Sequence, residues 1–176
     1  MRYLQGSLDH SILYMMGGGG FVGYMDANWA NNATNHCSIS GYMFMYSGGA
    51  ISWTSRQQLS TALSSTHAEY IATAKAAKEL VWLHHLLSKV CEEVIGPTTL
   101  YIDNCTADLL ACNPINHSAT KHIEVCYHYI CKCVADGQVA LHLIGTNNMA
   151  TDILTKPLAW IKHNQFCLML GMEFLE

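Results

Sequence analysis

Apolar and polar positions along this chain of 176 residues follow two different periods. Short apolar and aromatic runs bounded by glycine or polar residues predict strands. These runs lie at 21–27, 40–55, 98–103 and 138–145. The second run is divided by Gly48-Gly49, which predicts two strands joined as a hairpin.

Helical spacing of apolar residues is clearest over 66–89. Apolar residues recur there at Ile71, Ala74, Ala77 and Val81. Thr66 and Glu69 have the spacing of a capping box at the start of this segment. Further helices are expected at 104–111, 119–136, 148–155 and 158–171. A hairpin of strands followed by alternating strands and helices indicates an α/β fold on a mixed sheet.

Composition narrows the class of protein. Hydrophobic residues make up 51% of the chain and charged residues 12%, against about 25% in a typical domain. This excludes intrinsic disorder, and no apolar run reaches the ~20 residues that a membrane span needs. We expect no signal peptide at the N-terminus. The net charge of −4 is unlike that of a basic nucleic-acid-binding domain.

Cysteine and histidine are frequent, at eight and ten residues. Without a secretory signal the cysteines should be reduced thiols, and no C-x-x-C pair is present. His122, Cys126 and Cys133 could share a helix face, but a structural zinc normally takes four ligands with paired short spacings. We therefore favour interior positions of an amphipathic helix over a metal site.

Four of the thirteen acidic residues lie at the ends of predicted elements. Asp26 and Asp103 end strands, while Glu69 and Asp152 lie in the first turns of helices. In open α/β sheets such positions converge on one crevice, where clustered carboxylates are tolerated by binding divalent cations. Two Mg²⁺ ions held this way can activate a water and stabilise the leaving oxygen of a phosphodiester.

Each acid also has a purely structural explanation. Glu69 could complete the capping box of Thr66, and Asp152 could complement a helix dipole. Asp26 and Asp103 could form turns. The functional interpretation therefore depends on all four acids together.

Seven segments carry a resemblance to a known family. They are GYMDANWA (23–30), SISGYMF (38–44), AISW (50–53), ALSSTHAEY (62–70), LYIDN (100–104), HSATKHIE (117–124) and TDILTKPL (151–158). In this order they resemble the ribonuclease H domain of copia-type LTR retrotransposon Pol polyproteins. Residues 2–14 resemble the segment that joins reverse transcriptase to ribonuclease H.

The resemblance implies an RNase H-like fold, with a five-stranded mixed sheet flanked by helices. It implies residues 1–20 as the tail of the reverse transcriptase–RNase H connection with a glycine-rich joint, 21–157 as the domain, and 158–176 as a C-terminal helical extension. The implied activity is endonucleolytic cleavage of the RNA strand of RNA–DNA hybrids, with two Mg²⁺ ions or Mn²⁺. The family's catalytic, metal-binding acids fall on Asp26, Glu69, Asp103 and Asp152, with Asp152 on the more mobile element.

Hybrid binding should depend on phosphate contacts, because A-form-like duplexes are recognised by shape and by 2′-hydroxyl groups. The candidate contacts are basic or hydrogen-bonding side chains near the acids: Arg56, Ser64, Ser65, Asn104, Lys121, His122 and Lys156. For each basic residue alone, an ordinary solvated surface position is the simpler explanation. The chain holds nine lysines and arginines, so the reverse transcriptase domain of the parent polyprotein should supply most of the affinity.

Two alternatives stay open. The chain could be an inactive retrotransposon remnant that keeps the fold as a tether or weak nucleic-acid binder. Cellular ribonucleases H carry a helper histidine before the last acid, whereas 144–151 contains none here. An integrase-like transferase is the third possibility, and the ordered motifs disfavour it. The expected location is intracellular, in a cytoplasmic virus-like particle or the nucleus, without a membrane.

Overall fold

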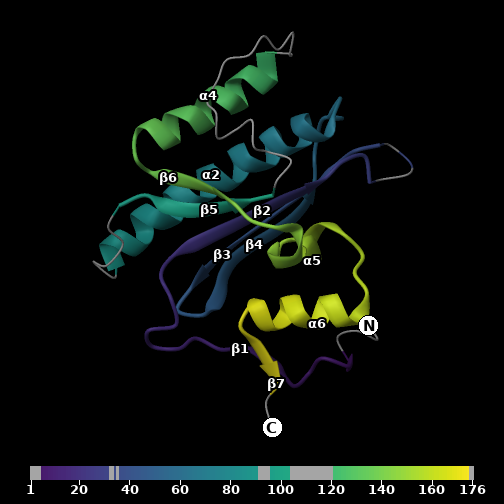
Figure 1. Ribbon diagram of the computed structural model, residues 1–176, viewed down its shortest axis with the longest axis vertical. Helices are drawn as coiled ribbons and strands as arrows, with labels where there is room; N and C mark the ends of the chain where they lie inside the picture. Colours follow the sequence, from purple (N-terminus) through teal and green to yellow (C-terminus); the bar gives the residue numbers. More distant parts are fainter. Residues whose placement is uncertain (1–4, 32–33, 35, 91–95, 104–120, 175–176) are drawn as a thin grey trace.

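The protein is described by a computed structural model that covers residues 5–31, 34, 36–90, 96–103 and 121–174, without the side chains of 121–123 and 174. Figure 1 shows a central sheet with helices on both faces. The elements in chain order are β1 (His10–Ile12), β2 (Val22–Asn28), β3 (Ile39–Tyr46), β4 (Gly49–Gln57), α2 (Ser65–Val90), β5 (Thr98–Ile102), α4 (Lys121–Ala135), β6 (Val139–Leu143), the 3-10 turn η2 (Thr146–Asn148), α5 (Asp152–Thr155), α6 (Trp160–Met169) and β7 (Met172–Phe174).

The main sheet has five strands in the order β4-β3-β2-β5-β6. Strands β2, β3 and β4 pair antiparallel, whereas β5 pairs parallel with both β2 and β6. This arrangement confirms the predicted α/β fold with a five-stranded mixed sheet. Because β2 and β5 are parallel neighbours, Asp26 near the end of β2 and Asp103 after β5 lie at the same edge of the sheet.

The predicted hairpin is confirmed. Its turn is formed by Ser47 and Gly48, which both have positive φ, at +52° and +84°. Two successive positive φ angles match the right-handed twist of the flanking strands. The turn therefore falls one residue earlier than the Gly48-Gly49 pair suggested.

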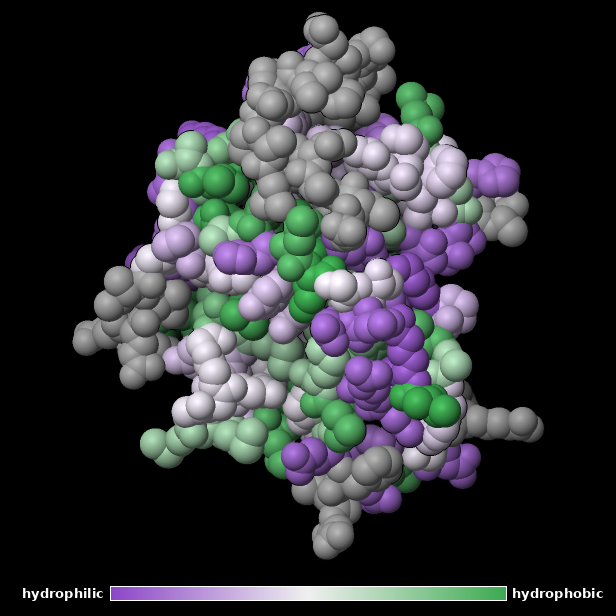
Figure 2. Space-filling view, in the orientation of Figure 1, coloured by the Kyte–Doolittle hydropathy of each residue, from purple (hydrophilic) through white to green (hydrophobic). Residues whose placement is uncertain are grey.

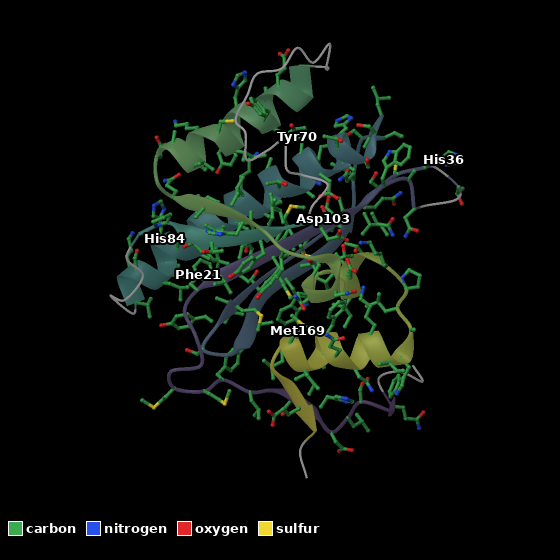
Figure 3. The ribbon with its side chains drawn as sticks, in the orientation of Figure 1. Phe21, His36, Tyr70, His84, Asp103 and Met169 are labelled. Carbon is green, nitrogen blue, oxygen red and sulfur yellow. The ribbon has the colours of Figure 1, made fainter. Side chains whose placement is uncertain are left out.

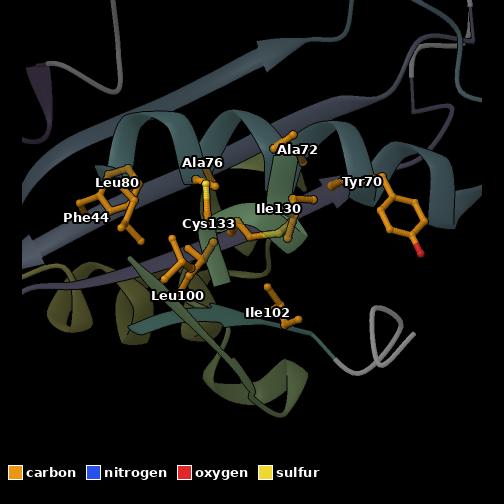
Figure 4. Close-up of a cluster of buried hydrophobic side chains, with 14 of the residues drawn as sticks. Phe44, Tyr70, Ala72, Ala76, Leu80, Leu100, Ile102, Ile130 and Cys133 are labelled. Atoms are coloured by element: carbon orange, nitrogen blue, oxygen red, sulfur yellow. The ribbon is translucent and has the colours of Figure 1, made fainter. Parts of the chain in front are cut away.

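The hydrophobic core lies between the sheet and helices α2 and α4. Figure 4 shows Ala72, Ala76 and Leu80 of α2 facing Leu100 of β5 and Ile130 of α4. Small alanine side chains let α2 pack closely against elements on more than one side. The other face of the sheet packs against α5 and α6, around Met43, Ala150 and Phe166.

The capping box predicted for α2 is wrong. The helix begins at Ser65, and its cap is Ser64, whose hydroxyl accepts a hydrogen bond from the His67 backbone N–H at 3.1 Å. His67 in turn accepts a bond on Nδ1 from the Leu63 N–H at 3.1 Å. The side chain of Glu69 is therefore not part of the cap of α2.

A second, two-stranded sheet was not predicted. Strand β1 pairs antiparallel with β7, which brings the two ends of the described chain together. Gly171, with φ of +77°, follows α6 and turns the chain out of the helix into β7. The predicted glycine-rich joint lies nearby, where the Ser47 N–H donates to the Gly19 carbonyl at 3.1 Å. The division into three domains stays a prediction.

Candidate active site

Three carboxylates meet at the edge of the sheet where β2 and β5 end. One oxygen each from Asp26, Glu69 and Asp103 lies within 4.8 Å of the other two. Asp26 is 1% exposed and Glu69 is 4% exposed, and Figure 3 shows Asp103 at the end of the sheet that faces α5. We call these three residues the acidic triad. In the part of the chain that the structure describes, no other group of three possible metal ligands is this close.

The local sequence explains why these acids converge. Along β2 the side chains alternate, so Met25 is buried in the core under α2 while Asp26 contacts α5 on the opposite face. Glu69 extends from the first turns of α2, which packs across β2. Glu69 also accepts a hydrogen bond from the backbone of Ala27, one residue after Asp26.

Burial and repulsion between carboxylates raise the pKa of two members of the acidic triad, Asp26 and Glu69. Burial, followed by the charges of Asp26 and Asp103, raises the pKa of Glu69 to about 9. Burial also raises the pKa of Asp26, although Thr155 and Lys156 oppose that shift. A carboxyl group that keeps its proton because two carboxylates lie beside it would release that proton to bind a divalent cation.

The fourth predicted acid, Asp152, lies beside Asp26 but outside the acidic triad. Its Oδ1 is 2.8 Å from the Nζ of Lys156, and its Oδ2 is 3.1 Å from the Nζ of Lys162. Lys156 also lies 3.2 Å from the Asp26 carboxylate. We call Asp26, Asp152, Lys156 and Lys162 the ion-pair network. Asp26 is thus shared by the acidic triad and the ion-pair network.

Helix α5 is held firmly against the sheet beneath these acids. The hydroxyl of Thr155 donates to Asp26, the Asn28 amide donates to the Thr155 carbonyl at 3.0 Å, and Ser55 donates to the Leu154 carbonyl at 2.6 Å. Figure 2 shows hydrophilic side chains gathered over α5 and α6. The resemblance implied that Asp152 lies on a mobile element, yet α5 makes three polar contacts with neighbouring strands.

The donor set fits hard divalent cations. Carboxylate oxygens are the ligands that Mg²⁺ and Mn²⁺ prefer, and the acidic triad offers three of them in a buried cluster. The alternative site around His122, Cys126 and Cys133 gains no support: Cys126 and Cys133 are free thiols, partly and fully buried, and the His122 side chain lies outside the described residues.

The predicted nucleic-acid contacts are placed unevenly. Arg56 is exposed on β4, and Ser64 and Ser65 are exposed where α2 begins. Lys156 lies in the ion-pair network. The sequence analysis predicted neither these ion pairs nor the participation of Lys162. The sequence offered one clue to Lys162: it lies ten residues after Asp152, just beyond Pro157, and so close to it along the chain. Asn104 and the side chains of Lys121 and His122 lie outside the described residues, so these three stay predictions.

Comparison with known proteins identifies relatives over almost the whole chain. The Retrovirus-related Pol polyprotein from transposon RE2 of Arabidopsis thaliana is 35% identical over 173 residues, which cover 98% of this chain and 12% of the polyprotein. The corresponding polyprotein from transposon TNT 1-94 of Nicotiana tabacum is 38% identical over 159 residues, 89% of this chain. The chain therefore spans about 12% of the length of these relatives. No family model matches the chain.

Solved structures with a similar fold are ribonucleases H. LC11-RNase H1, isolated from compost, superposes with a TM-score of 0.56 and 14% identity, covering 77% of this chain and 92% of that chain. The same enzyme in complex with an RNA/DNA hybrid gives a TM-score of 0.53 and 12% identity, covering 77% and 93%. At these identities the likeness concerns the fold. In the described part of the chain, no helix is both long and apolar enough to cross a membrane.

Proposed function

This chain is homologous to the Pol polyproteins of copia-type retrotransposons over nearly its whole length and has an RNase H-like fold, and we propose that it hydrolyses the RNA strand of RNA–DNA hybrids as a metal-dependent endonuclease. The observation that carries this proposal is the acidic triad, three carboxylates within 4.8 Å of one another at the edge of an RNase H-like sheet. An RNA/DNA hybrid bound to LC11-RNase H1 supports the choice of substrate.

Asp26, Glu69, Asp103 and Asp152 would hold Mg²⁺ or Mn²⁺ in this site. Bound divalent cations would supply an activated water and neutralise charge on the leaving oxygen. The chain's own contribution is orientation: Asp26 is fixed by the Thr155 hydroxyl, and Glu69 is fixed by the backbone of Ala27. Such fixed carboxylates need little rearrangement when the substrate binds.

The remaining predicted residues would contact the hybrid. Exposed Arg56, Ser64 and Ser65 lie on β4 and at the start of α2, where they can donate hydrogen bonds to phosphates. We propose the same role for Asn104, Lys121 and His122. With so few basic residues the affinity should fall steeply with salt, and we propose that the reverse transcriptase domain of the parent polyprotein provides further contacts with the hybrid.

Cleavage of a labelled RNA–DNA hybrid in Mg²⁺ or Mn²⁺ tests the proposal. Wild type should cleave the RNA strand, and Asp103→Asn should lose this activity while remaining folded by circular dichroism. Asp136→Asn is the matched control, because it makes the same chemical change on an exposed residue just after α4. Folded wild-type protein that binds no Mn²⁺ and cleaves no hybrid would contradict the proposal and favour an inactive remnant.

A further inference from the structure

The ammonium group of Lys156 lies between two of the proposed metal ligands. Its Nζ is 2.8 Å from Asp152 Oδ1 and 3.2 Å from the Asp26 carboxylate. The side chains of both acids are almost fully buried, at 1% and 2% exposed, whereas the lysine side chain is 32% exposed. One ammonium group thus forms ion pairs with two buried carboxylates.

The backbone at Lys156 is tied to the turn that carries Asp152. Lys156 follows Asp152 by four residues, and its N–H donates to the Asp152 carbonyl at 2.9 Å. The turn that carries both residues is fixed to the sheet through Ser55 and Asn28. The docking of α5 on the sheet therefore positions the Lys156 side chain next to both carboxylates.

Within the described part of the chain, Asp152 is the one carboxylate that Lys162 pairs with. Its Nζ is 3.1 Å from Asp152 Oδ2 and lies 5.2 Å from the centre of the Phe166 ring, one helical turn further along α6. Lys162 therefore supplies an internal comparison, because it contacts the same acid as Lys156 but does not bridge to Asp26.

We propose that Lys156 is a resident counter-cation that competes with a divalent cation for Asp26 and Asp152. The two metal positions of the proposed nuclease are then unequal. The acidic triad takes the first ion, and a second ion gains the oxygens of Asp26 and Asp152 only by displacing Lys156. This inference rests on the proposed function, because it concerns the same carboxylates.

The competition follows from the geometry. An ammonium group within hydrogen-bond distance of both carboxylates occupies the oxygen lone pairs that a hard cation would need. It also repels a second cation brought next to it. In the metal-free protein the same contacts offset the cost of burying two acids, which gives Lys156 a structural role while the second ion is absent.

Titration of the metal-free full chain with Mn²⁺, without nucleic acid, tests the competition, with free Mn²⁺ measured by electron paramagnetic resonance. Wild type should bind one ion tightly and a second weakly. Lys156→Met should tighten the second event at least about tenfold, and Asp152→Asn in the same background should remove that gain. Lys156→Arg keeps the cation and should behave as wild type. Lys162→Met should tighten the second event by less than Lys156→Met does, because Lys162 pairs with Asp152 and not with Asp26.

The outcomes separate this inference from the proposed function. A first Mn²⁺ bound normally, with a second bound no more tightly in Lys156→Met than in wild type, would overturn the competition alone. Folded wild type and Lys156→Met that both bind no Mn²⁺ would overturn the proposed function and this inference with it. If Lys156→Met does not fold without metal, Lys156→Gln, which keeps a hydrogen-bond donor, is titrated in its place under the same criteria.

Discussion

The acidic triad and the ion-pair network share Asp26 but handle buried negative charge in opposite ways. In the acidic triad, Glu69 faces the carboxylates of Asp26 and Asp103, and its pKa rises to about 9. In the ion-pair network, Asp152 faces the ammonium groups of Lys156 and Lys162. The acidic triad therefore reduces its charge by holding a proton, whereas the network balances its charge with lysine.

This difference assigns separate tasks to the two regions. A cluster that holds a proton at neutral pH exchanges it for a metal ion when one binds. A network with its own cations keeps its geometry without metal, at the cost of resisting a second ion. The two regions should therefore respond differently to the loss of a carboxylate, to pH and to changes in the elements that carry them.

The largest expected effect is on catalysis, and it applies to both regions. Asp103→Asn and Asp152→Asn should each reduce hybrid cleavage by roughly 10³-fold or more, because each removes a proposed metal ligand. Metal-free stability should separate them. Asp152→Asn weakens two charge-assisted hydrogen bonds and should cost about 1–3 kcal/mol, more than Asp103→Asn. Urea denaturation without metal measures this, and equal losses would contradict the comparison.

The next effect is a pH dependence of the metal-free protein. An ordinary glutamate titrates at 4.5, whereas folded Glu69 titrates at about 9. Between these values the folded protein holds a proton that the unfolded chain has released. The titration of Glu69 should therefore lower metal-free stability as pH rises through this window, by at most about 1.4 kcal/mol per pH unit. The raised pKa of Asp26 acts in the same direction.

Thermal unfolding from pH 5 to pH 9 in the presence of a chelator checks this slope. Glu69→Gln, which mimics the protonated side chain, should flatten it, while Glu124→Gln on the exposed start of α4 should not. Saturating Mn²⁺ should abolish the trend, since metal displaces the proton from the same oxygens and the folded and unfolded chains then hold equal numbers of protons. A slope that survives Glu69→Gln unchanged would show that another group holds the proton.

A smaller effect should come from the docking of α5, which carries the ion-pair network. A Cβ atom at Gly41 of β3 would lie 2.5 Å from Thr155 Cγ2 and 3.1 Å from Leu154 Cβ. Gly41→Ala should therefore push α5 away from the sheet and cost about 1–3 kcal/mol. The network should weaken more than the acidic triad, so tight binding of the first Mn²⁺ should be retained.

Gly145→Ala is the matched control, because no atom lies within 4 Å of a Cβ added there. Chemical denaturation and Mn²⁺ titration of both variants measure the two effects. Equal stability of the two variants would mean that α5 tolerates displacement, and loss of the first Mn²⁺ in Gly41→Ala would mean that the two regions are not separable.

Sequence position predicted the convergence of three of the four acids, and it did not predict the lysines paired with the fourth. Asp26 and Asp103 were found because the ends of parallel strands share one sheet edge, a rule that needs only the order of elements. Lys156 was a candidate phosphate contact, with an ordinary solvated surface position as the simpler explanation. Its proximity to Asp26 depends on how α5 docks on β2, which no local pattern encodes.

The same limit explains the other differences. Strands β1 and β7 have three residues each and come from opposite ends of the chain, so their pairing leaves no periodic signal. Ser64, Ser65 and Thr66 are all able to cap a helix, and in the structure the hydroxyl that accepts from the first turn of α2 belongs to Ser64. Local sequence defines the candidates, and tertiary contacts choose among them.

The smallest expected effect tests whether Ser64 caps α2, the helix that carries Glu69 of the acidic triad. Ser64→Ala removes the hydroxyl that accepts from the His67 N–H and should cost about 1 kcal/mol. Thr66→Ala is the control and should cost less, because Thr66 lies inside the first turn. Since Glu69 lies one turn further along α2, fraying at Ser64 should weaken the first Mn²⁺ event slightly and leave the ion-pair network intact. Urea denaturation and Mn²⁺ titration measure the two effects. A larger loss of stability in Thr66→Ala than in Ser64→Ala would restore the capping box that the sequence suggested. Glu69 would then be the partner of Thr66 instead of a metal ligand.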